Sequence, residues 1–156
     1  MHNDLDEADQ ALIGLLRSHP RASVSELARR TGLARGTVHS RLDRLDERGV
    51  IIGYGPDIDA RAAGYDVQAF ASVSIAQGRH DETIAKLSEI AEVVEVHTVT
   101  GDGDLLLRII ATTNDHLHAV LQQVTHIPDV GRTETQLALA TPVQRSVADL
   151  IAMTRN

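Results

Sequence analysis

Apolar residues along the first fifty positions recur every three or four residues in three separate stretches, the spacing of one face of an α-helix. The first stretch follows Asp6, a good helix-capping residue, and the second follows Ser23, with Glu26 at the position of a capping box. The third runs from about Arg35 to Arg48. The pattern therefore predicts three N-terminal helices, whose apolar positions are Ala8, Leu12, Leu15 and Leu16, then Val24, Leu27 and Ala28, then Val38, Leu42 and Leu45.

A tight turn is predicted between the second and third helices. Gly32 follows Thr31 where a residue with positive φ would end the second helix. Ala28, Gly32 and Val38 have the spacing Ala-x3-Gly-x5-Val, in which the small Ala28 lets the two helices approach closely. Three helices with such a turn are typical of a helix-turn-helix, although other small helical hairpins share the pattern.

Beyond Gly49 the helical spacing of apolar residues gives way to segments typical of strands and further helices. Residues 50–56 predict a strand that ends at a Gly-Pro turn, and the stretch to Tyr65 has the composition of a hinge. Further strands and helices are expected in the order β-α-β-β-α-β: strands over 67–77, 93–99, 105–111 and 132–140, and helices over 81–91 and from a capping Asn114 to before Pro128.

This order defines an α+β protein. We expect an N-terminal three-helix, winged-type helix-turn-helix and a C-terminal βαββαβ ferredoxin-like sandwich. The expected boundaries are 1–52 for the helix-turn-helix, 53–65 for a strand and hinge linker, and 66–156 for the C-terminal domain.

The predicted sheet is apolar on both faces. Leu105, Leu107 and Ile109 alternate with Leu106 and Ile110. Helices cover one face, so the other is expected to meet a second subunit in a twofold dimer. The tail is expected to form a short amphipathic docking helix through Val143, Val147, Leu150 and Ile151.

Charge is segregated along the chain, although the net charge is −7. Between Arg17 and Arg48, eight arginines stand against four acids, a local charge of +4. A local basic stripe in a helix-turn-helix indicates DNA binding, while a solvated arginine-rich face is the alternative. The residues expected to face DNA are Arg35, Gly36, Thr37, His39, Ser40, Arg41 and Arg44.

Their positions suggest different roles. Residues near the start of a recognition helix approach base edges, so Arg35 is suited to guanine, and Thr37, His39 and Ser40 to other edges or to phosphates. Arg41 and Arg44 are further along and are expected to bind phosphate, although Asp43, Asp46 and Glu47 offer Arg44 alternative partners.

Other protein classes find little support. No phosphate loop, nucleophile elbow or EF-hand spacing is present, the histidines are scattered, and there is no cysteine, so no catalytic residue, metal site or cofactor is expected. No stretch is apolar enough to span a membrane, and the acidic start lacks a signal core, so a cytoplasmic protein is expected. A scaffold whose helical module binds protein remains an alternative, which the arginine-rich third helix disfavours.

Taken together, several segments resemble the Lrp/AsnC (leucine-responsive, feast/famine) family of transcriptional regulators over nearly the whole chain. The segments that carry the resemblance are Leu5-Asp6-x-x-Asp9, residues 27–33 (LARRTGL), 38–45 (VHSRLDRL), 49–54 (GVIIGY), 100–108 (TGDGDLLLR) and Thr133-Glu134-Thr135.

The resemblance implies a transcriptional regulator that binds specific sequences of double-stranded DNA. It also implies that the protein forms dimers, which assemble into tetramers or octamers. It also implies that an amino acid or related metabolite acts as effector between dimers. By position, the effector residues are Thr100, Gly101, Asp102, Gly103 and Asp104, with Thr133 and Thr135 from the last strand. Asp104 is suited to an α-ammonium group, and N–H groups around Gly101 to an α-carboxylate. The alternative functions are a nonspecific DNA-architectural protein and a small-molecule-sensing oligomer without effector-switched DNA binding.

Two residues depart from the family pattern. Gly103 stands where relatives often have an aromatic or other large residue, which affects the identity of the ligand. Ala34 stands where many relatives have a capping Ser or Thr, a loss that weakens the start of the third helix by about 1 kcal/mol. A plain hairpin turn is the alternative interpretation of Gly101 to Asp104, and it is compatible with effector binding.

Overall fold

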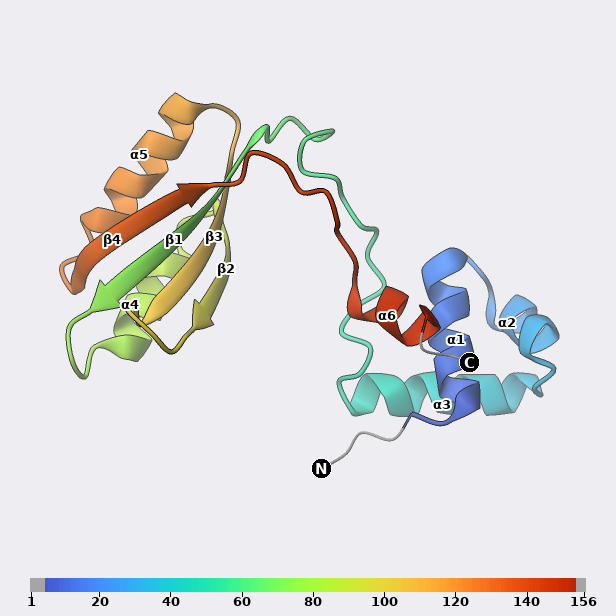
Figure 1. Ribbon diagram of the computed structural model, residues 1–156. Helices are drawn as coiled ribbons and strands as arrows, with labels where there is room; N and C mark the ends of the chain where they lie inside the picture. Colours follow the sequence, from blue (N-terminus) through green and yellow to red (C-terminus); the bar gives the residue numbers. More distant parts are fainter. Residues whose placement is uncertain (1–4, 154–156) are drawn as a thin grey trace. The chain divides into compact units, whose positions relative to one another are not determined.

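The computed structural model describes residues 5–153 and divides into two compact units (Figure 1). One unit contains the chain up to Asp57 together with the chain from Val143 onward, and the other is Ile58–Pro142. Each unit has its own buried apolar cluster.

The first unit holds the three predicted N-terminal helices. The structure confirms their caps: the Asp6 carboxylate accepts a hydrogen bond from the Asp9 N–H at 2.9 Å, and the Ser23 hydroxyl from the Glu26 N–H at 3.2 Å. Gly32 ends the second helix with a φ of 74°, as the predicted turn requires. The helices of this unit are α1 (Glu7–Ser18), α2 (Val24–Thr31), α3 (Arg35–Glu47) and α6 (Val147–Met153).

The helical core of this unit is formed by the predicted apolar positions. Ala28 is buried on α2, and Val38 is buried on α3 in the same cluster, which agrees with the close helix approach expected there. The buried members of the cluster are Leu12, Leu27, Ala28, Val38 and Leu42.

The tail helix α6 packs against α1. A Cβ placed on Gly14 of α1 would lie 3.7 Å from the Cβ of Ala152, and the Arg17 Nε donates to the Asp149 carboxylate at 2.8 Å. The expected boundaries assigned this tail to the C-terminal domain. The amphipathic pattern indicated a docking helix, but such a pattern does not specify which surface receives it.

The strand predicted over residues 50–56 is not formed, and residues 51–59 adopt neither helix nor strand. The N–H groups of Val50 and Ile51 both donate to the Leu45 carbonyl, so this segment begins by closing the end of α3. Ile51 packs on the helical core. A strand needs a neighbour for its backbone hydrogen bonds, and the described part of this unit supplies none.

The second unit has the predicted β-α-β-β-α-β order. Its elements are β1 (Val67–Ile75), α4 (His80–Ser88), β2 (Val93–Thr98), β3 (Leu105–Ala111), α5 (Asn114–Thr125) and β4 (Val130–Leu137). The strands form one antiparallel sheet in the order β2-β3-β1-β4. Thr113, rather than the expected Asn114, caps α5, because its hydroxyl accepts from the His116 N–H at 3.1 Å.

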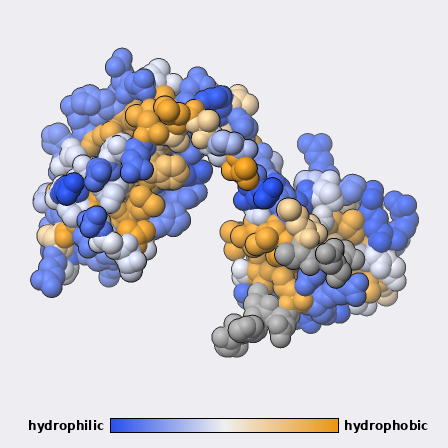
Figure 2. Space-filling model, in the orientation of Figure 1, coloured by the Kyte–Doolittle hydropathy of each residue, from blue (hydrophilic) through white to orange (hydrophobic). Residues whose placement is uncertain are grey.

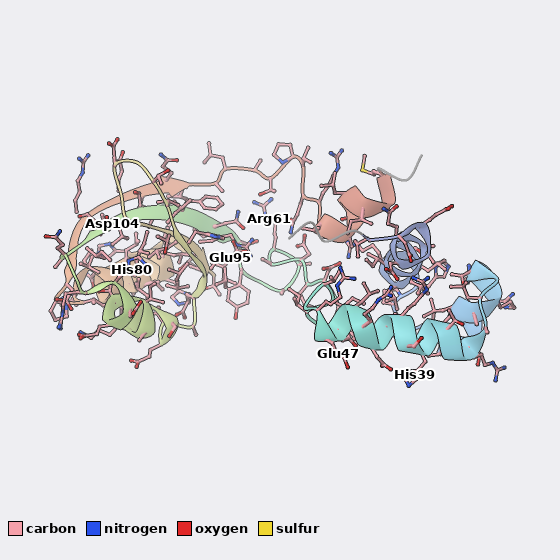
Figure 3. The ribbon with its side chains drawn as sticks, turned by 90° about the horizontal axis from the view of Figure 1, so that it is seen from below. His39, Glu47, Arg61, His80, Glu95 and Asp104 are labelled. Atoms are coloured by element: carbon pink, nitrogen blue, oxygen red, sulfur yellow. The ribbon has the colours of Figure 1, made fainter. Side chains whose placement is uncertain are left out.

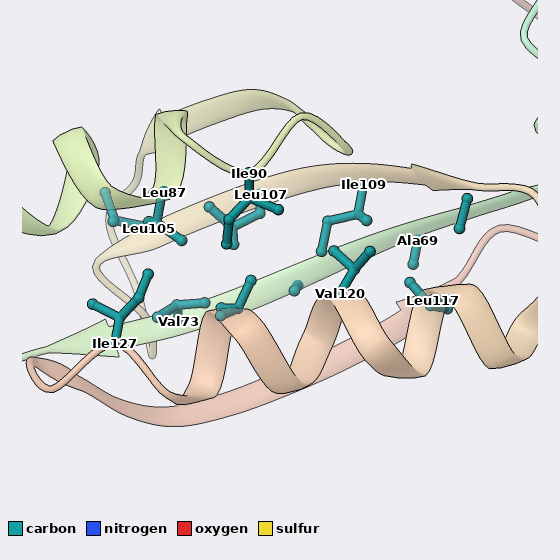
Figure 4. Packing of buried hydrophobic residues seen from close by; sticks show 13 residues of the cluster. Ala69, Val73, Leu87, Ile90, Leu105, Leu107, Ile109, Leu117, Val120 and Ile127 are labelled. Atoms are coloured by element: carbon teal, nitrogen blue, oxygen red, sulfur yellow. The ribbon is translucent and has the colours of Figure 1, made fainter.

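One face of this sheet is the core. Alternate residues of β1 and β3, such as Val73 and Leu107, are fully buried and form one cluster with Leu87 of α4 and Val120 of α5 (Figure 4). The residues between them point to the other face. They include Phe70, Leu106 and Ile110, which remain partly exposed. The predicted two-sided apolar pattern is therefore present, with the helices on one side only.

Candidate nucleic-acid interface and effector site

The first turns of α3 carry five of the seven residues expected to face DNA, and all five are exposed. Val38 between them is fully buried and fixes that side of the helix to the core. Figure 3 shows His39 projecting from α3 on the side away from α1. The five residues are Arg35, Gly36, Thr37, His39 and Ser40.

This surface is open and polar. A Cβ on Gly36 would meet no atom within 4 Å, so the glycine is not required by packing and leaves room for close approach of a ligand. The Ser40 hydroxyl donates to the Thr37 carbonyl at 3.2 Å, and His39 Nε2 lies 3.7 Å from the Asp43 carboxylate. Within residues 5–153, no salt bridge engages Arg35. Its guanidinium group is thus available for a base edge or a phosphate.

Arg41 and Arg44 have protein partners on α1. Arg41 Nη1 lies 2.7 Å from carboxylate oxygens of both Asp6 and Asp9, and Arg44 Nη2 lies 2.9 Å from Asp9. The Asp9 side chain is only 1% exposed. Hydrogen bonds from the Asp9 N–H and from Arg41 hold the pKa of Asp6 below its ordinary value. The pattern of the sequence placed Asp9 only in the first turn of a helix and gave no sign of this pairing across 32 residues.

Other arginines of the basic stretch are also paired. Arg30 donates to Glu26 at 2.8 Å, and this hydrogen bond lowers the pKa of Glu26. Arg17 forms ion pairs with Asp57 and Asp149. The local charge of +4 is therefore partly neutralised within the unit, whereas Arg35 at the start of α3 has no ion pair with any described residue.

The candidate effector turn joins β2 to β3 and lies against the end of β1. The Asp104 N–H donates to the Val73 carbonyl at 3.0 Å, and its carboxylate accepts from the Ile75 N–H at 2.8 Å. Gly101 has a φ of 127°, which favours glycine. A Cβ on Gly103 would lie 2.2 Å from Ser72 Oγ, so this position has no room for a side chain unless Ser72 moves.

Thr133 and Thr135 lie on β4, at the other side of β1. Thr133 pairs with Val73, the residue whose carbonyl receives the Asp104 N–H, so the structure brings Asp104 and Thr133 to opposite sides of one β1 residue. Thr135 pairs two residues further along, with Ala71. Both threonines share the register of buried β1 residues, which places them on the helix-covered side.

Two neighbours of the turn were not predicted. Ser72 touches the Gly103 position, and His80 Nε2 lies 3.0 Å from the hydroxyl of Thr98 at the end of β2. Figure 3 shows His80 and Asp104 within this unit. Neither neighbour carries a sequence signal, because each comes from a different element and only the sheet register brings it to the turn.

Family comparisons agree with this two-part architecture. Residues 5–52 match a family of winged helix-turn-helix DNA-binding domains, and residues 68–148 match the Lrp/AsnC ligand binding domain. A curated relative, the HTH-type transcriptional regulator FL11 of Pyrococcus horikoshii, is 36% identical over 141 residues, which cover 90% of this chain and 93% of that protein.

Solved structures show the same architecture. The structure of E. coli AsnC has a TM-score of 0.85 at 26% identity and covers 93% of this chain and 99% of that one. The feast or famine regulatory protein from M. tuberculosis, complexed with L-methionine, has a TM-score of 0.80 at 32% identity and covers 90% of this chain and 96% of that one.

A helix-turn-helix with an exposed recognition helix, joined to a ferredoxin-like ligand-binding unit, defines a DNA-binding transcriptional regulator. The chain belongs to the Lrp/AsnC family. The relatives are regulators rather than enzymes, which confirms the class predicted from the sequence. No helix among residues 5–153 is long and apolar enough to cross a membrane.

Proposed function

We propose that this protein binds operator DNA through the start of α3 and that an amino acid bound at the Gly101–Asp104 turn changes that binding. The observation that carries the DNA part is the exposed polar set from Arg35 to Ser40 on a helix whose opposite side is buried through Val38. The side chains of such a helix reach base edges in the major groove. Because its target is chromosomal DNA, the protein acts in the cytoplasm.

The proposed roles follow from position along α3. Arg35 grips guanine, while Thr37, His39 and Ser40 contact other base edges or phosphates, and Gly36 lets the backbone approach. Arg41 and Arg44 belong to the same interface at its distal end, where each commits one guanidinium nitrogen to α1.

The proposed effector is a free amino acid, as in the M. tuberculosis relative with L-methionine. Asp104 is exposed and uses its Oδ2 for the Ile75 N–H, so its Oδ1 remains to accept a bond from an α-ammonium group. Backbone N–H groups around Gly101 and Asp102 suit the α-carboxylate. Thr100, Thr133 and Thr135 complete the proposed set, and Gly103 limits it on the Ser72 side.

The proposed assembly is a twofold dimer through the uncovered sheet face, with dimers joining further into tetramers or octamers. Apolar surface lies exposed among polar side chains over this sheet (Figure 2). A twofold dimer presents two recognition helices to two half-sites about one DNA turn apart.

The test is a selection of duplexes from a random library, followed by anisotropy titrations of the selected and a scrambled duplex over a salt series. We expect tighter binding of the selected duplex, a steep loss of affinity with salt, and a Kd that shifts on addition of single amino acids. The Arg35→Ala variant should lose about tenfold in affinity for the selected duplex and less for the scrambled one. Equal affinity for both duplexes would instead indicate a nonspecific architectural protein.

A further inference from the structure

Asp9 is the one fully buried carboxylate on α1 that faces the recognition helix. Its side chain is 1% exposed, and it accepts hydrogen bonds from Arg41 Nη1 at 2.7 Å and from Arg44 Nη2 at 3.0 and 2.9 Å. The two arginines are three residues apart, so they lie on the same side of α3. Asp9 thus binds α3 through two arginines that are separated by about one helical turn.

Asp6 extends this grip at its more exposed end. Its carboxylate accepts from Arg41 Nη1 at 2.8 and 2.7 Å and also caps α1 by accepting from the Asp9 N–H. The N-cap Asp6 and Asp9 of α1 therefore face two arginines of α3, and the four side chains form one cluster without net charge. We call these four residues the α1–α3 clamp.

The clamp adds directional contacts to the apolar packing of α3 in the helical core. Val38 and Leu42 hold α3 through dispersion and burial, which have little directional preference. Charge-assisted hydrogen bonds to a buried carboxylate are directional and are costly to break, since an unpaired buried charge is strongly destabilising. The clamp therefore fixes the rotation and axial position of α3 on α1.

We propose that Asp9 is a positioning residue for DNA recognition, which holds Arg41 and Arg44 so that the start of α3 meets base edges in one register. This rests on the proposed DNA-binding function and assigns a role to a residue outside the interface. Arg41, only 22% exposed, acts mainly through the clamp, while Arg44, 47% exposed, keeps outward N–H groups for phosphate. The clamp neutralises part of the positive charge of Arg41 and Arg44 and in return fixes the position of α3.

The proposal makes a prediction opposite to that of charge alone. Asp9→Asn keeps the size of the side chain and removes one negative charge near the DNA, so electrostatics alone would tighten binding to every duplex. If Asp9 positions α3, its neutralisation leaves scrambled DNA bound equally well or better but weakens the selected duplex. The Kd for the scrambled duplex divided by the Kd for the selected duplex should then fall about tenfold. A loss of this size is equivalent to the loss of one base contact.

The experiment measures Kd for the selected and scrambled duplexes with the full-length wild type, Asp9→Asn and the control Glu47→Gln. Glu47 is an exposed acid on α3 outside the clamp, so its variant removes the same charge and should leave the ratio unchanged. Circular dichroism and thermal unfolding establish that each variant is folded. If Asp9→Asn is unfolded, Asp6→Asn replaces it, because asparagine still caps α1 while the negative charge that faces Arg41 is removed.

Each outcome decides one question. A wild type that does not discriminate between the duplexes refutes the proposed function itself. A discriminating wild type together with a reduced ratio in the clamp variant and an unchanged ratio in Glu47→Gln supports the positioning role. An unchanged ratio in a folded clamp variant, or the same reduction in Glu47→Gln, overturns it.

Discussion

The hydroxyl of Tyr54 links the segment after α3 back to that helix. It donates to the Asp46 carboxylate at 3.0 Å, and partial burial together with this acidic partner raises the pKa of Tyr54 to about 12. The raised value means that the folded chain holds the phenol proton more tightly than the unfolded chain, whose tyrosine titrates near 10. The resulting stabilisation is complete below about pH 10 and is lost as the pH rises toward 12.

Tyr54→Phe should therefore lower the free energy of unfolding by about 1 kcal/mol at neutral pH and remove this alkaline component. The measurement is urea unfolding of wild type and variant at about pH 8 and about pH 11, where the difference between the two proteins should shrink. Tyr65→Phe is the matched control, since Tyr65 is the other tyrosine of the chain. A gap for Tyr54→Phe that stays constant with pH would contradict the assigned pKa.

Gly103 illustrates how one residue restricts the space at the candidate effector turn. A Cβ at this position would stand 2.2 Å from Ser72 Oγ, and the next nearest atoms are at 3.5 Å. Gly103→Ala should thus destabilise the second unit by about 1 kcal/mol, because Ser72 must leave its rotamer. Removing the hydroxyl in Ser72→Ala/Gly103→Ala should restore stability, and the double-mutant cycle in urea unfolding measures the coupling. Simple additivity of the two changes would show that the contact is unimportant.

At the scale of elements, the start of α3 lacks a side-chain cap. Ala34 occupies the N-cap position with extended backbone and accepts no side-chain hydrogen bond, as its sequence position predicts. Ala34→Ser should stabilise the protein by about 1 kcal/mol, because a serine hydroxyl can accept a bond from the first turn of α3. Thermal unfolding checks this, with Ala140→Ser, an exposed site outside the helices, as control. Equal shifts for both variants would argue against capping.

The elements that the sequence predicted correctly are those whose signals are local. The caps at Asp6 and Ser23, the turn at Gly32 and the alternation around Val73 all depend on neighbours within a few residues. The prediction of a strand over residues 50–56 is wrong, because a short apolar run before a Gly-Pro turn does not show whether a second strand is present to pair with it.

The candidate DNA interface was likewise predictable only where its signals are local. The exposed residues at the start of α3 follow from helical periodicity around the buried Val38. The partners of Arg41 and Arg44 could not be deduced, since Asp9 is 32 and 35 residues away and only the packing of α1 on α3 brings them together. The contact between Gly103 and Ser72 likewise depends on sheet register.

At the scale of the whole molecule, α6 belongs to the same compact unit as α1, α2 and α3, although it comes from the other end of the chain. Arg17 of α1 pairs with Asp57, where the chain leaves this unit, and with Asp149 shortly after it returns. The hydrogen bond from Arg17 holds the pKa of Asp149 far below its ordinary value, so the pair persists in mild acid and weakens only as pH falls below the usual carboxylate range. The two chain segments that lead to and from the second unit are thus both held to α1 through Arg17.

Assembly is the remaining requirement of the proposed function, because one recognition helix would read only half of a twofold operator. Leu106 lies on the uncovered sheet face, opposite Ser72 and His97 in the register of β3. Leu106→Glu should place a charge in the proposed dimer contact and convert the proposed dimer to a monomer in sedimentation experiments. It should also weaken operator binding more than tenfold, since the second half-site would no longer contribute through a linked subunit. Ala85→Glu adds the same charge to an exposed position of α4, on the helix-covered side, and should leave the dimer intact. A folded Leu106→Glu variant that sediments as the wild-type dimer would place the contact on another surface, and the two recognition helices would then have to be spaced by a different twofold axis.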